Sequence, residues 1–390
     1  MRIRLIISCL LTLLTVVCSA QSGRSDLRRG ENSFFANYIH SVSAFGGRGN
    51  TLTGNIWGVS AGYNFSMDNN NSYWARALDA KNVVLAFSYI NMKDAAIVGS
   101  PQPRGILGEA FNVQGQLDLT LFNINKIRVA LLPGFGLSYV TETFRTNDNR
   151  LIGSHINMNT GLGMKVEIPF TGSTKIVVGA DIFHFSNTAY KLPNNGINFI
   201  NTSVGVVTGL HTYEKERKRT FNESAKKGAF EFGIGVGHRG LQQQFGVGSI
   251  SLADSLERKF GTSKLNNVGM LLGYNYRLNP LLSIKTASDI VYYTTTFDRP
   301  NYRTTTQEYG TSKDKFSVGL SAGFDIWLNK LVFEASYGYY LHLNYFSTPV
   351  NTYWSAGVKY YVKPWVALEA KTHLHKAEAH YTNFGVLFSY

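Results

Sequence analysis

The chain has almost no cysteine, and this absence removes several kinds of chemistry. Its 390 residues include only Cys9 and Cys18, and both lie within residues 1–20. Basic residues near the start, an apolar run and small residues up to Ala20 predict that residues 1–20 are a secretory signal peptide. A lipoprotein anchor on Cys18 is the alternative, but Val17 is bulky where such sites favour a small residue. Without the signal peptide, the chain has no thiol for a disulfide, a metal site or a nucleophile.

Long apolar runs are also lacking. After residue 20 no run approaches the roughly 18 residues that a membrane-spanning helix needs. The mean hydropathy of the whole chain is only −0.10. These two observations exclude a helical membrane protein.

Glycine, aromatic residues and alternation are abundant instead. The chain contains 38 glycines, 9 prolines and 13% aromatic residues, with many segments in which apolar and polar residues alternate. This pattern is typical of a transmembrane β-barrel with an apolar outside and a polar inside. A soluble β-sandwich or a periplasmic barrel is the rival. However, Phe384, Val386, Phe388 and Tyr390 alternate up to a terminal aromatic residue, as in outer-membrane barrels. We therefore predict an all-β fold, a transmembrane antiparallel β-barrel over residues 21–390 in the bacterial outer membrane.

The alternating segments predict about sixteen strands, an even number as bacterial barrels have. They fall into two sets, residues 31–210 and residues 229–390, and the clearest strand covers residues 126–140. One closed barrel is preferred, because closure removes every exposed edge at once. Two tandem barrels of about eight strands each are the alternative, because the second set loosely repeats the first.

Loop lengths orient the barrel, since short turns lie in the periplasm and longer loops lie outside. The charged segment 211–228 falls on the periplasmic side, and a charge run of this kind is usually a solvated loop. With the N-terminus in the periplasm, the strand that carries His184 runs outward. It ends at the cell-surface rim, where the lipid is lipopolysaccharide.

The candidate site lies in residues 174–201. Because successive strand residues point to opposite faces, His184 and Ser186 share one face with Ile176, Val178, Ala180 and Ile182. A hairpin centred near Lys191 then places Asn198 of the returning strand opposite His184. A hydroxyl, an imidazole and an amide are thus predicted to lie together. They suit acyl transfer, because a serine hydroxyl is a weak nucleophile without an adjacent base.

The same residues resemble a known signature. The run His184-Phe185-Ser186-Asn187, followed by Pro193-Asn194-Asn195-Gly196-Ile197-Asn198, resembles that of the outer-membrane lipid A 3-O-deacylase (PagL-like) family, also called acyloxyacyl hydrolases. The resemblance is confined to residues 31–210. It implies a carboxylic ester hydrolase that removes an ester-linked acyl chain from lipid A or lipopolysaccharide. Ser186 would be the nucleophile and His184 the base, while Asn187, Asn194 and Gly196 would lie near the oxyanion or support the loop.

The chain departs from this family at the third catalytic position, where a glutamate is expected and Asn198 stands. An amide oxygen can still accept the histidine N–H and fix its tautomer, as in proteases with a Cys-His-Asn triad. It cannot neutralise the imidazolium, which argues for slower catalysis. Glu109 or Glu142, from other loops, could supply the missing carboxylate.

Two other functions stay open on this pattern. One is a non-enzymatic outer-membrane barrel, a pore or a lipopolysaccharide-binding structural protein, and the other is an outer-membrane phospholipase that uses the same pair. His373 and His375 share one face of a late strand and could suggest a metal site. They more simply fill the barrel interior beside charged groups, so neither a metal nor another cofactor is predicted.

The charge balance is basic, with 38 Lys and Arg against 25 Asp and Glu, and a formal net charge of +13. Without the two arginines of the signal peptide it is +11. Nucleic acid is not expected as a partner, because the basic residues are spread singly rather than gathered in one patch. Arg104, Arg145, Arg150 and Lys191 belong to loops on the side of the site, where they either meet lipid A phosphates or are solvated charges.

Overall fold

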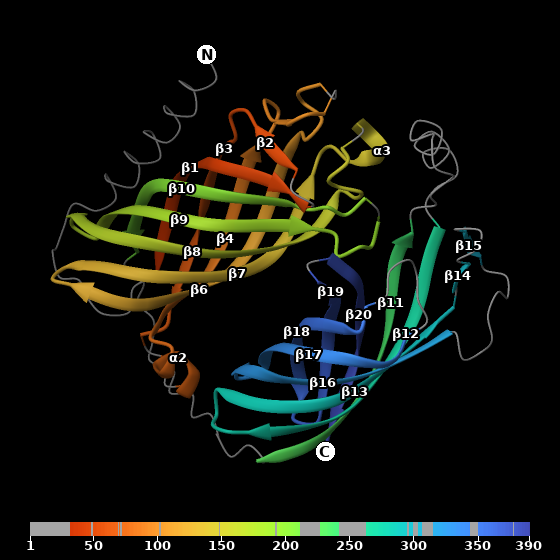
Figure 1. Cartoon of the computed structure of the whole chain (residues 1–390). Coiled ribbons are helices and arrows are strands. Elements are labelled where there is room, and N and C mark those ends of the chain that lie inside the picture. The colour runs from red at the N-terminus through yellow and green to blue at the C-terminus, as the bar shows by residue number, and fades with distance from the viewer. Residues whose placement is uncertain are drawn as a thin grey trace.

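The computed structural model is almost entirely β (Figure 1). It describes residues 32–47, 50–68, 70, 72–100, 103–147, 149–191, 193–210, 227–241, 263–294, 296–298, 303–305, 315–343, 350–376 and 378–390. The expected signal peptide, residues 1–20, lies outside this part of the chain, as do residues 211–226 of the charged segment expected in the periplasm. Within the described residues, no helix is both long and apolar enough to cross a membrane.

The first barrel is built from eight antiparallel strands in the order β10-β9-β8-β7-β6-β4-β3-β1. It closes because β10 pairs with β1, from Ser33 with Gly209 to Gly46 with Ile197. Short strands β2 and β5 extend the sheet beyond β1, and short helices α2 and α3 lie in loops. The bounds are β1 (Ser33–Gly46), β2 (Thr51–Thr53), β3 (Trp57–Ser66), α2 (Tyr73–Ala77), β4 (Ala80–Asn91), β5 (Ala96–Ile97), β6 (Glu109–Ile124), β7 (Ile127–Val140), α3 (Phe144–Asn147), β8 (Ile156–Thr171), β9 (Thr174–Ser186) and β10 (Ile197–Gly209).

The second barrel is closed in the order β11-β12-β13-β16-β17-β18-β19-β20, with β11 also paired to β20. A separate pair of short strands, β14 and β15, lies between β13 and β16 in the sequence. The bounds are β11 (Gly228–Leu241), β12 (Ser263–Arg277), β13 (Leu282–Tyr293), β14 (Thr296–Asp298), β15 (Arg303–Thr305), β16 (Phe316–Leu328), β17 (Leu331–Leu343), β18 (Thr352–Lys363), β19 (Val366–His375) and β20 (Glu378–Ser389).

These closures correct the preferred single barrel of about sixteen strands and confirm its alternative, two tandem barrels. The reason lies at β1, which pairs with β3 on one side and with β10 on the other. No edge of the first strand set is left to accept a strand of the second. Alternation along a strand shows which face it buries but not which strand it pairs with, so the sequence pattern could not decide between the two.

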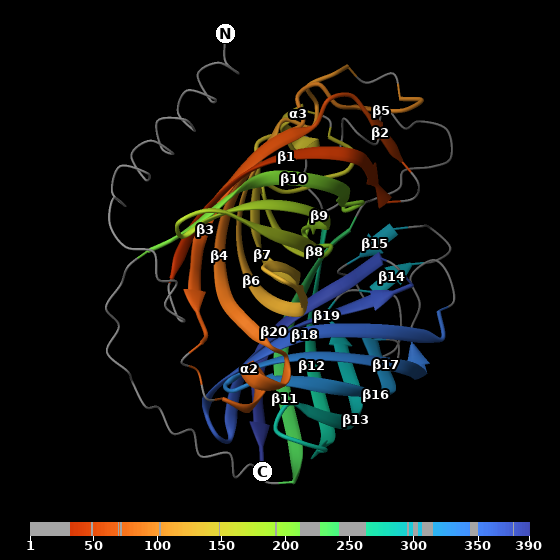
Figure 2. The same cartoon turned by 90° about the vertical axis from the view of Figure 1, so that its left-hand side faces the viewer.

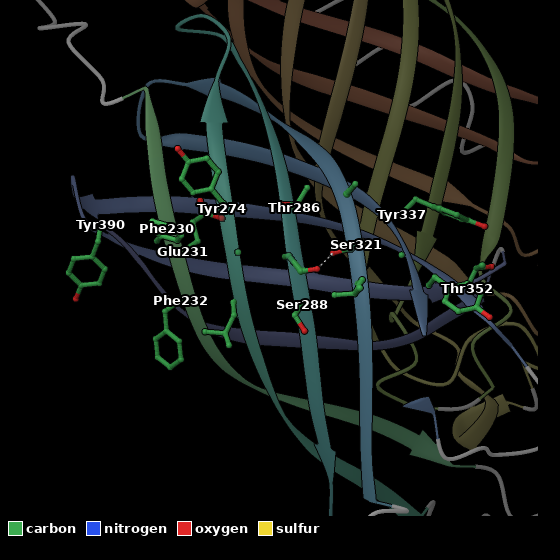
Figure 3. Close-up of a pocket in the computed structure, with 17 residues that line it drawn as sticks. Phe230, Glu231, Phe232, Tyr274, Thr286, Ser288, Ser321, Tyr337, Thr352 and Tyr390 are labelled. Carbon is green, nitrogen blue, oxygen red and sulfur yellow. Dashed lines mark hydrogen bonds between the residues drawn. The ribbon is translucent and has the colours of Figure 1, made fainter. Parts of the chain in front are cut away.

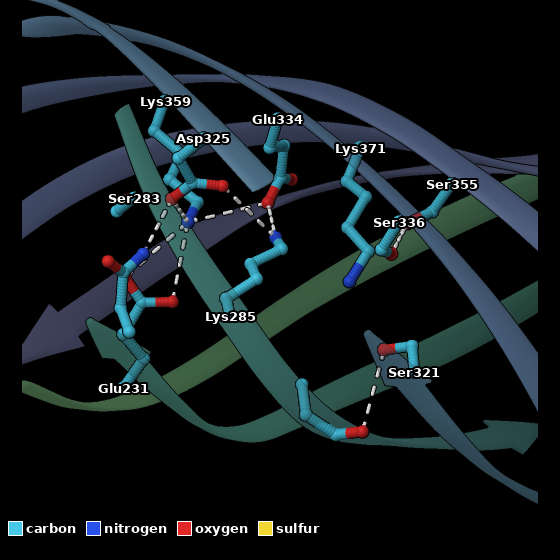
Figure 4. A network of polar contacts seen from close by, with 12 residues as sticks. Glu231, Ser283, Lys285, Ser321, Asp325, Glu334, Ser336, Ser355, Lys359 and Lys371 are labelled. Carbon is cyan, nitrogen blue, oxygen red and sulfur yellow. Dashed lines mark hydrogen bonds and ion pairs between the residues drawn. The ribbon is translucent and has the colours of Figure 1, made fainter. Parts of the chain in front are cut away.

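Paired charges fill the interior of each barrel. In the first, Arg128 lies 2.8 Å from Asp118 and 2.5 Å from Glu167. In the second, Lys359 lies 2.9 Å from Asp325, within a larger buried network (Figure 4). An eight-stranded barrel is just wide enough for side chains to fill. The charges inside it pair because an isolated buried charge is costly.

The histidines of β19 are part of this interior. The ring of His373 stacks with Tyr353 at 5.6 Å and with Tyr381 at 4.6 Å between centroids, and the hydroxyl of Tyr340 lies 2.8 Å from Nε2 of His375. In the described part of the chain, no group of three or more His, Cys, Asp or Glu side chains is arranged to hold a metal ion.

The outer surface of the second barrel is hollowed where small side chains lie among large ones. Thr286 and Ser288 of β13 lie between Tyr274 of β12 and Tyr337 of β17, and the groove they share has a volume of about 880 Å³ (Figure 3). The groove faces away from the barrel interior, because the outward residues of these strands line it.

The two barrels lie against each other in both views (Figures 1 and 2). Trp74 and Ala75 of α2 share an apolar cluster with Leu328 at the end of β16. The rings of Phe135 on β7 and Phe333 on β17 meet edge to face, with 5.3 Å between centroids. The second barrel therefore covers part of the outward face of the first.

Candidate active site

The pairing of β9 with β10 brings the predicted residues together. His184 lies directly opposite Asn198 in the register, as the hairpin predicted. Nδ1 of His184 lies 2.8 Å from Oδ1 of Asn198, and Nε2 lies 3.1 Å from Oγ of Ser186. Since an amide oxygen can only accept, the neutral imidazole donates its Nδ1–H to Asn198 and accepts the hydroxyl proton of Ser186 at Nε2. This is the tautomer that a general base requires.

The orientation of the Asn198 amide follows from a second contact. Its Nδ2 donates to the backbone oxygen of Phe45, on the neighbouring strand β1, at 3.2 Å. The two ends of an amide are told apart by their hydrogen bonds, and a carbonyl oxygen can bind only the nitrogen end. Oδ1 is therefore the atom turned toward His184.

The loop between β9 and β10 is held by its asparagines. The backbone N–H of Asn187 donates to Oδ1 of Asn194 at 2.8 Å, and Nδ2 of Asn187 donates to the backbone oxygen of Lys191 at 2.7 Å. Gly196 has a φ of +65°, and a Cβ at this position would lie 2.7 Å from Cε1 of His184. Glycine thus lets the loop return directly beside the imidazole.

The site faces outward, away from the barrel interior. Neighbouring residues on the same face are exposed, Ile182 by 57% and Ile200 by 40%. On the opposite face Phe185 and Phe199 are fully buried, with 5.6 Å between ring centroids. The buried aromatic side fixes the two strands, and the reactive groups are left on the surface that a surrounding lipid would touch.

The two candidate replacement carboxylates are bound elsewhere. Glu109 accepts a hydrogen bond from the hydroxyl of Tyr89 at 2.6 Å and pairs with Lys93 at 2.7 Å. Glu142 accepts from the hydroxyl of Thr146 at 3.4 Å. Because both ring nitrogens of His184 already have partners, Asn198 is the residue placed to orient it.

Of the basic loop residues, two lie next to the site. Lys191 belongs to the loop itself, and the backbone oxygen of Arg150 accepts a hydrogen bond from Nδ2 of Asn195 at 3.0 Å. Arg104 and Arg145 are exposed in other loops.

Two further supports of the site carried no signal in the sequence. The backbone oxygen of Leu151 accepts the N–H groups of Asn195 at 3.0 Å and Gly196 at 3.1 Å, and that of Phe45 holds Asn198. Both act through the backbone, so any residue type would serve. Only the pairing of distant segments reveals them.

Comparison with protein families matches both halves of the chain. Residues 51–207 match the model of lipid A 3-O-deacylase (PagL), and residues 229–390 match that of the acyloxyacyl hydrolase C-terminal domain (PagL_C). The first span lies within the first barrel and includes the site, and the second coincides with the second barrel. No curated protein matched the chain.

Among solved structures, the chain is similar to the outer membrane enzyme PagL, with 16% identity over 44% of this chain and 97% of that chain, at a TM-score of 0.31. It is also similar to the Acinetobacter baumannii outer membrane protein Omp33, with 9% identity over 93% of this chain and all of that chain, at a TM-score of 0.18. With one barrel matched by each family model, this chain belongs to the PagL-like family of lipid A 3-O-deacylases and acyloxyacyl hydrolases.

Proposed function

We propose that this protein is an outer-membrane hydrolase whose first barrel removes an ester-linked acyl chain from lipid A. Ser186 is the nucleophile, His184 the base and Asn198 the orienting residue. The observation that carries the proposal is that the imidazole of His184 joins the other two side chains on the outward face of the barrel. The family match of residues 51–207 supports lipid A as the substrate.

The reaction follows from these contacts. Oγ of Ser186 attacks the ester carbonyl carbon while Nε2 of His184 takes the hydroxyl proton. The tetrahedral intermediate collapses, the bond to the sugar oxygen breaks, and that oxygen takes the proton back from His184. A water molecule then attacks the acyl-serine with His184 again acting as base, which releases the fatty acid and restores the hydroxyl.

Asn198 keeps His184 productive without supplying a charge. Replacement of the carboxylate by an amide in a serine triad lowers turnover by about 10⁴, largely because the wrong tautomer forms. Here the contact with Phe45 turns Oδ1 toward the imidazole and preserves the right tautomer. The remaining loss of turnover is electrostatic, because the amide dipole of Asn198 stabilises the imidazolium less than a carboxylate charge would. We therefore expect slow but real turnover.

The location of the site suits a substrate that lies in the membrane. The strand β9 ends at Ser186, and the loop that follows it, residues 187–196, lies on the same end of the barrel as the longer loops 92–108 and 141–155. With the shorter turns in the periplasm, this end reaches the outer leaflet, where lipid A resides. Asn187 and Asn194 support the loop in this arrangement, and Gly196 lets it lie against His184.

The buried charge networks speak against a pore. In each barrel, ion pairs occupy the interior between residues that are less than a tenth exposed, such as Arg128 with Asp118 and Lys359 with Asp325. An aqueous channel needs a wider barrel. A phospholipase would use the same three residues, so the two enzymes differ in substrate and not in site.

Purified protein in detergent, supplied separately with lipid A and with a glycerophospholipid, tests the proposal by mass spectrometry of the products. We expect the wild type to release one fatty acid from lipid A, and Ser186→Ala and His184→Ala each to abolish release while the barrel stays folded. The two losses should not add, because the pair acts as a unit. Release from the glycerophospholipid alone would make the protein a phospholipase, and no release from either would refute the hydrolase.

A further inference from the structure

Two of the contacts between the barrels flank the site. The first is the ring contact between Phe135 and Phe333. In the strand register Phe135 lies opposite Thr160, and Thr160 lies opposite His184. These three residues form one row across the outward face, so Phe135 is two strands, or roughly 10 Å, from the imidazole.

The second contact is in the site loop. Tyr190, four residues after Ser186, meets the ring of His238 on β11 with 4.7 Å between centroids. The two residues just before Tyr190 have positive φ angles, Thr188 of 52° and Ala189 of 66°. Such conformations are unfavourable for residues other than glycine and persist only where the surroundings hold them. The second barrel thus supports the loop that follows the nucleophile.

We propose that the second barrel forms the second wall of the cleft that receives the acyl chain cleaved at Ser186. This inference rests on the proposed function and extends it. An acyl chain bound with its carbonyl at Ser186 must run down the outward face of β9, over Ile182 and Val178, which are 57% and 47% exposed. Phe333 borders this path on the side of β7 and β8.

The wall continues beyond Phe333 along β17. Residues two apart on a strand share a face, so Phe333 and Tyr337 point to the same side, and Tyr337 lines the groove of about 880 Å³ (Figure 3). A single barrel would leave the chain in contact with lipid on this side. The surrounding lipid is as apolar as this wall, so the second barrel adds no hydrophobic attraction for the acyl chain. Instead, the shape of the cleft selects which acyl chain lengths fit.

Fluorophosphonate probes test the cleft. Oγ of Ser186 attacks phosphorus, the P–F bond breaks, fluoride leaves and the hydroxyl proton passes to Nε2 of His184. The measured quantity is the ratio of the labelling rate with hexadecyl fluorophosphonate to the rate with ethyl fluorophosphonate, on full-length protein in detergent. Phe333→Trp should lower this ratio about tenfold, since excess bulk of about one methylene group in a fitted apolar pocket lowers reactivity by about this factor. Phe333→Ala should shift the ratio in the opposite direction.

Two further variants keep the test decisive. Phe135→Trp narrows the same contact from the first barrel and should also lower the ratio, even if the Phe333 variants fail to fold. Met270→Trp adds bulk on the outward face of β12, where Met270 is 37% exposed, and should leave the ratio at the wild-type value. If both probes label Ser186 but the ratio of their labelling rates is unchanged in Phe333→Trp and Phe135→Trp, the cleft is refuted and the catalytic pair is not. No labelling of wild-type Ser186 by either probe would overturn the catalytic pair and the cleft with it.

Discussion

Replacement of Asn198 by glutamate probes the least usual feature of the site. The substitution places a carboxylate beside His184, where the structure has an amide oxygen 2.8 Å from Nδ1. The glutamate side chain is one methylene longer, and Asn198 is only half-buried on the outward face. The carboxylate can therefore reach Nδ1 while its second oxygen turns away from the carbonyl of Phe45.

The size of the effect can be worked from this geometry. Two unit charges about 4 Å apart interact by about 4 kcal/mol at the effective dielectric near a protein surface. The amide already provides a hydrogen bond to a charged group, which contributes about 1.5–3 kcal/mol. The difference, about 1–2.5 kcal/mol, stabilises the imidazolium in the transition state. It corresponds to a rise in kcat of roughly 5- to 70-fold.

The assay is fatty acid release from lipid A by purified protein, with Asn198→Ala as the matched variant. Asn198→Ala removes the orienting hydrogen bond and should lower kcat by roughly 10- to 100-fold, the value of one hydrogen bond to a charged group. An increase with glutamate and a decrease with alanine would establish Asn198 as the third member of the triad. A decrease with glutamate together with no change in Asn198→Ala would refute this reasoning.

Two further substitutions test the supports of the site and of the fold. Gly196→Ala should lower activity about 100-fold in a folded barrel, because its Cβ would lie 2.7 Å from Cε1 of His184 and displace the base. Gly172→Ala has a similar φ of +54° with no atom within 4 Å of the added Cβ, and should keep its activity. Lys359→Met removes the ammonium that Glu231, Asp325 and Glu334 share, while Lys285 still pairs with Asp325 and Glu334. The lost partner of buried Glu231 should cost about 3 kcal/mol of stability, seen as a lower temperature for the gel shift of the folded barrel. The exposed Lys330→Met should leave that temperature unchanged.

The pairing of His184 with Asn198 could be predicted from the sequence because it depends on two local rules. Side chains alternate along a strand, and one hairpin joins β9 to β10. Together these rules placed His184, Ser186 and Asn198 on one outward face, where the structure has them. Their catalytic roles remain a proposal.

The closure of the barrels could not be predicted in the same way. The pairing of β1 with β10 joins residues more than 150 positions apart, and nothing in the pattern of either strand names its partner. The contacts of Tyr190 with His238 and of Phe135 with Phe333 are hidden for the same reason. In the sequence Phe135, His238 and Phe333 resemble ordinary lipid-facing strand positions, and Tyr190 resembles an ordinary loop residue.

The mass of lipid A from cells tests the central claim most directly. Lipid A from cells that express the wild type should be lighter by one acyl chain than lipid A from cells that express Ser186→Ala, with both proteins folded in the outer membrane. Equal masses, with the wild type folded at the same level, would contradict the assignment of Ser186 and His184 as the catalytic pair of a lipid A deacylase.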